Sequence, residues 1–147
     1  MGVCAFVAGG VNFDMDQYIR DTPFEVLSVF HKGDARPEGD PEDGPRPDSG
    51  FVAVVSHDHF PHLLDQVAEA VDFLEMREQD LKRLTELGVD WMALDFRVQQ
   101  ESGPTPTHHL PKELITAMSR WQMELAFSVE VAPEAEHHFR RFRSRRR

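Results

Sequence analysis

Three histidines between a strand and a helix form the clearest chemical pattern in the chain. His57, His59 and His62 follow the apolar run FVAVV (51–55) with the spacing H-x-H-x-x-H. Neutral imidazoles bind zinc and similar divalent ions, and three protein ligands leave one coordination position open for a water molecule. The spacing therefore predicts a metal site at the end of a strand. The alternative is a set of solvent-facing histidines, with Asp58 capping the helix that follows.

Beyond these histidines, no catalytic or cofactor motif is recognisable in the sequence. It has no serine–histidine–aspartate arrangement, paired-cysteine motif, phosphate loop or nucleotide fingerprint. The single cysteine, Cys4, lies in an apolar segment and is expected to be a small buried hydrophobe. We expect no cofactor apart from a divalent metal at the histidines, and a non-enzymatic role in preference to an enzymatic one.

Charged residues are distributed unevenly along the chain, and their distribution excludes some classes of binding partner. The chain has 16 basic and 26 acidic residues, but six of the basic ones are arginines within 140–147. Without them the formal charge falls from −10 to −16. The chain outside residues 140–147 is acidic enough to repel phosphate backbones. We therefore expect it to bind a protein and not a nucleic acid. No apolar run approaches the roughly 20 residues of a membrane span, and the N-terminus lacks the basic segment of a signal peptide. We therefore expect a cytoplasmic protein without a membrane partner.

A second candidate site lies on the segment VDWMALDFRV (89–98). Its alternation places Met92, Leu94, Phe96 and Val98 on one face of a strand. Trp91, Asp95 and Arg97 then share the opposite, outer face. An aromatic ring beside charged groups on an outer sheet face is typical of a contact surface, so these three residues are predicted to bind a partner.

The remaining elements follow from periodicity and turn residues. Strands are predicted at 3–8, ending at Gly9-Gly10, and at 24–31, 51–55, 89–98 and 122–131; a short helix is predicted at 14–21 and another after Pro111. The long helix between the third and fourth strands carries an apolar stripe, whose members are Phe60, Leu63, Leu64, Val67, Val71 and Leu74. Glu78 would fall within this stripe, so either the helix bends near 76–80 or Glu78 is a half-buried carboxylate. We favour the bend, because an unpaired buried charge is costly.

The domain boundaries follow from composition. Residues 1–138 are predicted to form a single α+β domain, and 139–147 an arginine-rich tail. Within the domain, residues 32–50 are rich in Pro, Gly and Asp and contain no large apolar residue, which predicts a mobile acidic loop. The order β-α-β-β-α-β-α-β indicates a largely antiparallel sheet with helices on one face. Its first six elements have the order of a ferredoxin-like unit, followed by a C-terminal α-β pair.

The chain resembles a bacterial family, the domain of unknown function 4279, over roughly residues 5–131. The similar segments are FVAGGVNFDMDQYI, the strand ended by HKGD, SGFVAVVS, LTELGVD at the end of the long helix, and LPKELITAMSRWQMELAFSVE. The resemblance implies the same α+β fold and supplies no catalytic residues. The acidic loop, the histidine cluster and the arginine tail are departures from it.

SHDHFPH after a strand is also similar to the H-x-H-x-D-H motif of metallo-β-lactamase-type hydrolases. That resemblance implies metal ligation by His57, His59 and His62. Pro61 stands where the motif has an aspartate, however, and the chain is short for that family's two-sheet sandwich. The favoured hypothesis is thus a small protein-binding or regulatory domain, with acidic immunity proteins as an analogy. The alternative is a metal-binding protein or a metal-dependent hydrolase.

Overall fold

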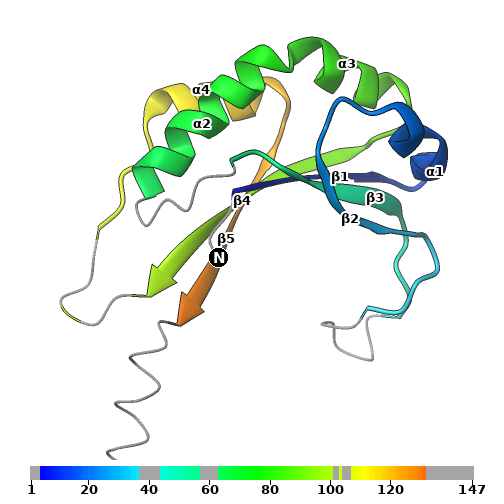
Figure 1. The fold of residues 1–147 in the computed structure, drawn as a ribbon, viewed down its shortest axis with the longest axis horizontal. Helices are drawn as coiled ribbons and strands as arrows, with labels where there is room; N and C mark the ends of the chain where they lie inside the picture. Colours follow the sequence, from blue (N-terminus) through cyan, green and yellow to red (C-terminus); the bar gives the residue numbers. More distant parts are fainter. Residues whose placement is uncertain (1–3, 37–43, 57–62, 101–102, 104–106, 132–147) are drawn as a thin grey trace, which may run out of the picture.

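Five strands and four α-helices form the part of the chain that the structure describes (Figure 1). The computed structural model describes residues 4–36, 44–56, 63–100, 103 and 107–131. The strands are β1 (Ala5–Gly10), β2 (Val26–Phe30), β3 (Ser49–Val54), β4 (Trp91–Gln100) and β5 (Glu124–Val131). The helices are α1 (Met15–Tyr18), continued by the 3-10 turn η1 (Ile19–Asp21), α2 (Leu63–Met76), α3 (Glu78–Glu86) and α4 (Lys112–Arg120). The predicted α+β class is confirmed.

The five strands form one mixed sheet in the order β2-β3-β1-β4-β5. The pairs β2–β3, β1–β3 and β1–β4 are antiparallel, whereas β4–β5 is parallel. The parallel pair arises because the chain leaves β4, crosses through α4 and returns in the same direction. This crossover puts β5 at the edge of the sheet, beside the long strand β4.

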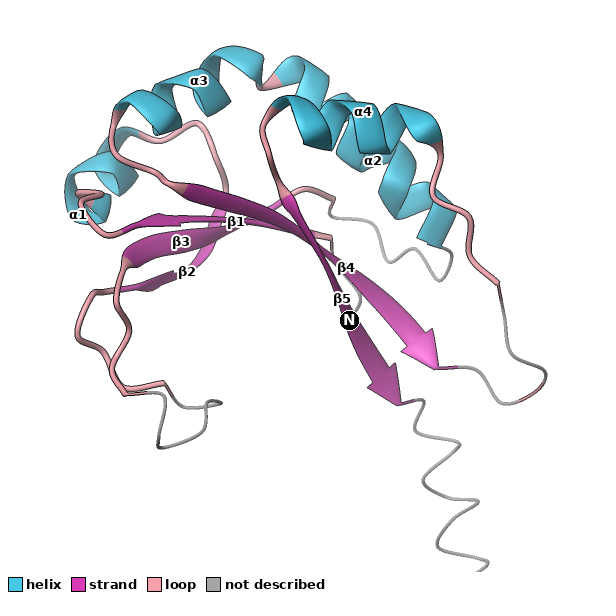
Figure 2. Ribbon diagram, turned by 180° about the vertical axis from the view of Figure 1, so that it is seen from behind, coloured by secondary structure: helices cyan, strands magenta, loops and turns pink. Residues whose placement is uncertain are grey.

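The helices cover one face of the sheet (Figure 2). On that face, side chains of the central strands β1, β3 and β4 are buried, among them Phe6, Phe51 and Leu94, and they pack in one core with Leu74 and Leu84 from the helices. The carboxyl ends of β4 and β5 project beyond the helical layer, as Figures 1 and 2 both show. The helix-side face of β5 is therefore only partly covered.

The long helix breaks at the predicted place. α2 ends at Met76 and α3 begins at Glu78, with Arg77 between them in a non-helical conformation (φ −103°, ψ 19°). Glu78, the first residue after the break, is half-buried and forms an ion pair with Arg120 on α4, so its charge is not left unpaired. The predicted stripe is wrong at Leu64, which is 64% exposed, because the buried face instead contains Gln66.

The predicted strand boundaries differ from the observed ones by one or two residues, and two of the differences involve glycines. β1 continues through Gly9 and Gly10 instead of ending there, and β3 begins at Ser49, inside the predicted 32–50 loop. Gly9 belongs in the strand because Trp91 lies against it: a Cβ at Gly9 would be 2.7 Å from Cζ2 of Trp91. The mobility of 32–50 and the division into 1–138 and 139–147 stay predictions, since 37–43 and 132–147 lie outside the described residues.

Within the described ranges, none of the helices combines the length and the apolar character needed to cross a membrane.

Candidate functional site

The predicted histidine site lies outside the described residues. His57, His59 and His62 fall in the gap between Ser56, which follows β3, and Leu63, the first residue of α2. Ser56 is buried, and its hydroxyl has no hydrogen-bond partner among the described residues. Within those residues, no group of three His, Cys, Asp or Glu side chains could hold a metal ion. The metal site therefore stays a prediction.

The second predicted site lies on the face of the sheet opposite the helices, hereafter the open face. Trp91 pairs with Gly9 and Asp95 with Ala5, whereas the intervening Leu94 pairs with Phe6 of the core. Because strand residues alternate between faces, Trp91, Asp95 and Arg97 all lie on the open face. Trp91 and Arg97 are six residues apart along β4, about 20 Å at the usual strand rise. They do not form one cluster.

Trp91 is held by contacts within the chain. Its ring stacks on Phe30 of β2, with ring centroids 6.1 Å apart and an interplanar angle of 16°. The two rings meet across β3 and β1 because the residues between them in the register are Gly50 and Gly9. The indole N–H donates a hydrogen bond to the carboxylate of Asp48. Trp91 is half-buried in this arrangement, which leaves only part of its surface for a partner.

The loop before β3 packs against the Phe30–Trp91 pair. The guanidinium of Arg46 lies 4.3 Å from the centroid of the Phe30 ring, a cation–π distance. Backbone hydrogen bonds fix the loop, from Gly33 N–H to the Arg46 carbonyl and from Arg46 N–H to the Asp34 carbonyl, both at 2.8 Å. The last residues of the predicted acidic loop thus pack against the sheet.

Asp95 and Arg97 join β4 to β5 on the open face. The hydroxyl of Ser128 donates to the Asp95 carboxylate, 2.9 Å from both oxygens. Arg97 lies 3.3 Å from the carboxylate of Glu130, and both side chains of this pair are about 40% exposed (42% and 40%). Solvent screens an exposed pair of this kind, so it contributes little to stability. It leaves a polar, charged surface near the edge of the sheet.

The backbone of Arg97 is held from the other side by a glutamine. Gln66 of α2 donates from Nε2 to the Arg97 carbonyl at 2.7 Å, and its Oε1 accepts from the Arg97 N–H at 3.1 Å. The described register of β1 against β4 begins at Ala5, opposite Asp95, so Arg97 lies beyond it. The buried amide of Gln66 therefore supplies the donor and acceptor that a neighbouring strand would supply.

An apolar row on β5 is the feature that the sequence analysis missed. Leu125, Phe127 and Val129, hereafter the β5 apolar row, lie on the helix side of the sheet, opposite Leu94, Phe96 and Val98 of β4, and they are 40%, 45% and 61% exposed. Ile115 of α4 is also exposed, at 57%. They are exposed because, among the described residues, the helices do not fully cover this edge strand. Contiguous exposed apolar side chains are typical of contact surfaces.

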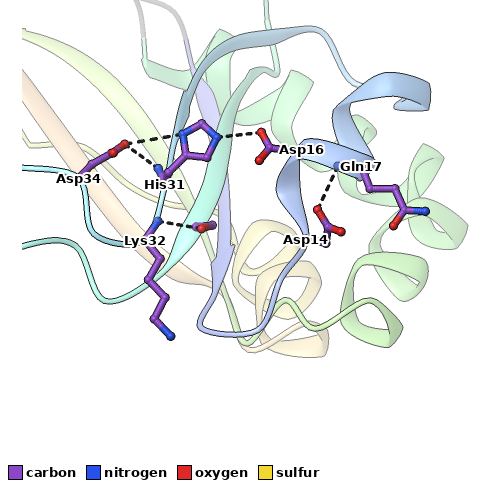
Figure 3. A network of polar contacts seen from close by, with 7 residues as sticks. Asp14, Asp16, Gln17, His31, Lys32 and Asp34 are labelled. Atoms are coloured by element: carbon purple, nitrogen blue, oxygen red, sulfur yellow. Dashed lines mark hydrogen bonds and ion pairs between the residues drawn. The ribbon is translucent and has the colours of Figure 1, made fainter.

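A polar network joins α1 to the end of β2 (Figure 3). His31 Nε2 lies 2.8 Å from the Asp16 carboxylate, and its Nδ1 lies 3.7 Å from that of Asp34. The hydrogen bond with Asp16, together with the negative charges of Asp16 and Asp34, raises the pKa of His31 above its ordinary value. The Asp14 side chain accepts from the Gln17 N–H and caps α1. These groups are exposed and hold the elements together at the surface.

Cys4 has the properties predicted for it. The side chain is fully buried in the core. Burial, with smaller contributions from the charges of Asp95 and Glu69, raises the pKa of the thiol to about 12. A thiol that stays protonated near neutral pH is neither a good nucleophile nor a good metal ligand.

Comparison with known proteins gives no match, since no family model, curated protein or solved structure resembles the chain closely enough.

Proposed function

We propose that this protein is a small non-enzymatic domain that binds another protein through the β5 edge of its sheet. The observation that carries the proposal is the β5 apolar row, whose three side chains are at least 40% exposed on an edge strand. Exposed apolar surface of this kind is stabilised when a partner removes it from water. The polar groups of Asp95, Arg97 and Glu130 beside it supply the rim that protein interfaces usually have.

The charge of the chain supports a protein partner over a nucleic acid. A formal charge of −16 outside residues 140–147 repels phosphate and attracts basic surfaces. Trp91, Asp95 and Arg97 contribute in different ways: Asp95 and Arg97 lie beside β5, whereas Trp91 is at the opposite end of β4. We propose Asp95 and Arg97 as part of the contact surface, with Trp91 holding the loop at Asp48 in place.

We also propose the ferredoxin-like arrangement for the first six elements and kinship with the bacterial domain of unknown function 4279. The order β2-β3-β1-β4 with antiparallel neighbours supports the arrangement, and α4–β5 is then an addition beside β4. The sequence segments quoted above are the support for the family. A cytoplasmic, immunity-like role against a basic protein is consistent with the acidic composition.

The test is a selection from a display library of protein fragments, with the full chain as bait. A charge-matched acidic protein of unrelated fold serves as the control for nonspecific attraction. We expect fragments that bind saturably to this chain and not to the control, with affinity that survives moderate salt because apolar contacts contribute. If every retained fragment binds the control equally well, the proposed function is wrong.

The second candidate function is metal binding, or metal-dependent hydrolysis, at His57, His59 and His62. Its support is the spacing of the histidines between β3 and α2. Elemental analysis of protein prepared without a histidine tag, compared with a variant that replaces all three histidines by alanine, tests it directly. Stoichiometric zinc, iron or manganese in the natural chain alone is the expected result, and equal traces in both proteins exclude the site.

A further inference from the structure

The two edges of the sheet differ in how well they are protected against further strand pairing. β2, at one edge, has five residues and a register irregularity between Val26 and Ser28 where it pairs with β3. β5, at the other edge, has eight residues in continuous register with β4, from Glu124 to Val131. Short length, bulges, lysines and prolines are the usual protections of an edge strand. β5 is neither short nor irregular and has no lysine or proline, and its charged residues, Glu124 and Glu130, both lie on the open face, whereas β2 is short and irregular.

Side chains on β5 separate by face according to chemistry. Toward the helices it presents the β5 apolar row, and toward the open face it presents Glu124, Ala126, Ser128 and Glu130. Glu130 already pairs with Arg97 across β4, so a basic group on the far side of Glu130 would continue a ladder of alternating charge. The edge is therefore apolar on one face and acidic on the other.

We propose that an extended segment of another protein adds to β5 as a sixth strand. Its residues alternate, with apolar side chains against the β5 apolar row and lysine or arginine on the open face, opposite Glu124 and Glu130. Main-chain hydrogen bonds along β5 supply affinity, and the alternation supplies specificity, as in other strand-addition complexes. This inference rests on the proposed protein-binding function and names the partner's chemistry and its mode of binding.

A second copy of this chain fits the same edge less well. The register that stacks two apolar rows fully is centred on Phe127, with Leu125 opposite Val129 of the other copy. That register also puts Glu124 opposite Glu130 of the other copy twice, and like charges directly opposite are destabilising. Each copy, moreover, carries a net charge of −10. A basic segment replaces both repulsions by attraction.

The probe for the test is a ten-residue peptide that alternates valine and lysine, with a valine–glutamate peptide as its control. Fluorescence polarisation of the labelled peptide measures affinity to the full chain. Hydrogen exchange of the backbone amides then shows where it binds. We expect the lysine peptide alone to bind, and to slow exchange along β5 and not along β2.

Val129→Lys places a charge in the β5 apolar row at its most exposed position. The matched control is Leu27→Lys, which makes the same kind of change on β2, where Leu27 is 57% exposed. We expect V129K to weaken the peptide at least about tenfold and L27K to leave it unchanged. Circular dichroism confirms that each variant folds, and Val129→Ser replaces V129K if the lysine variant does not.

Each other outcome is distinguishable. If fragments from the display library bind the chain but ignore V129K and leave exchange in β5 unchanged, strand addition is wrong while protein binding stands. If neither fragments nor peptides bind, the proposed function fails as well. If the chain forms a dimer at micromolar concentration and V129K dissociates it, β5 pairs with a second copy of this chain. If the peptide binds only after the six arginines of 140–147 are replaced by serine, the chain's own basic end occupies the β5 edge. Both results overturn the proposal.

Discussion

Replacing Gln66 by methionine removes the only side chain among the described residues that hydrogen-bonds to the Arg97 backbone. Methionine has nearly the same length and shape, so the packing of α2 on the sheet is preserved. The Arg97 N–H and carbonyl, bonded at 3.1 and 2.7 Å in the natural protein, lose their partners. A buried backbone group without a partner costs roughly 1–3 kcal/mol, and these two are part-buried, so the loss is about 3 kcal/mol. The more apolar methionine recovers about 1 kcal/mol.

The net expectation is a decrease in unfolding free energy of about 2 kcal/mol, or roughly 6 °C in melting temperature. Urea denaturation followed by tryptophan fluorescence measures it, and hydrogen exchange at the Arg97 amide should become faster. Gln79→Met is the matched control, because Gln79 is exposed on α3 and its replacement should stay within about 0.5 kcal/mol of the natural protein. Equal stability of Q66M and Q79M would refute the view that Gln66 substitutes for a neighbouring strand.

Three further predictions concern other contacts. Gly9→Ala should lower the unfolding free energy by about 1–3 kcal/mol because its Cβ would collide with Trp91, and the penalty should largely vanish in a Trp91→Ala background. Because the pKa of His31 is raised, its contribution to stability is complete below pH about 6.5 and is lost as the pH rises through the raised pKa. NMR titration of the His31 ring should show that Asp16→Asn lowers this pKa. An unchanged pKa in the variant would contradict the role of Asp16. Cys4, with a thiol pKa raised to about 12, should react with a disulfide reagent at pH 8 only on unfolding; fast reaction in the folded protein would show that it is accessible.

The order of the elements and the two faces of each strand could be predicted from the sequence, because both are local properties. Alternation identified the face of β4 that carries Trp91, and the conflict between Glu78 and the apolar stripe predicted the break at Arg77. In each case the signal lies within one segment. The physical reason is that the spacing of apolar residues within a segment depends on which of its faces is buried, whatever the order of the strands in the sheet.

The position of a strand within the sheet could not be predicted in this way. Alternation in β5 shows that Phe127 faces the helices, but it does not show that the helices end before they cover it. Gly9 and Gly50 look like turn residues in the sequence, and only the pairing of four strands reveals that they lie between Phe30 and Trp91. Gln66 was missed for the same reason, since its partner is a backbone 31 residues away.

The irregular, five-residue edge at β2 also limits how far these molecules can assemble. Pairing of β5 in one molecule with β2 in the next would be head-to-tail, so each addition would leave a fresh β5 edge and growth would continue into a filament. The register shift between Val26 and Ser28 and the length of β2 make it a poor match for eight residues of β5. An unpaired strand at one edge therefore does not lead to open-ended assembly, because the strand at the opposite edge is a poor partner for it.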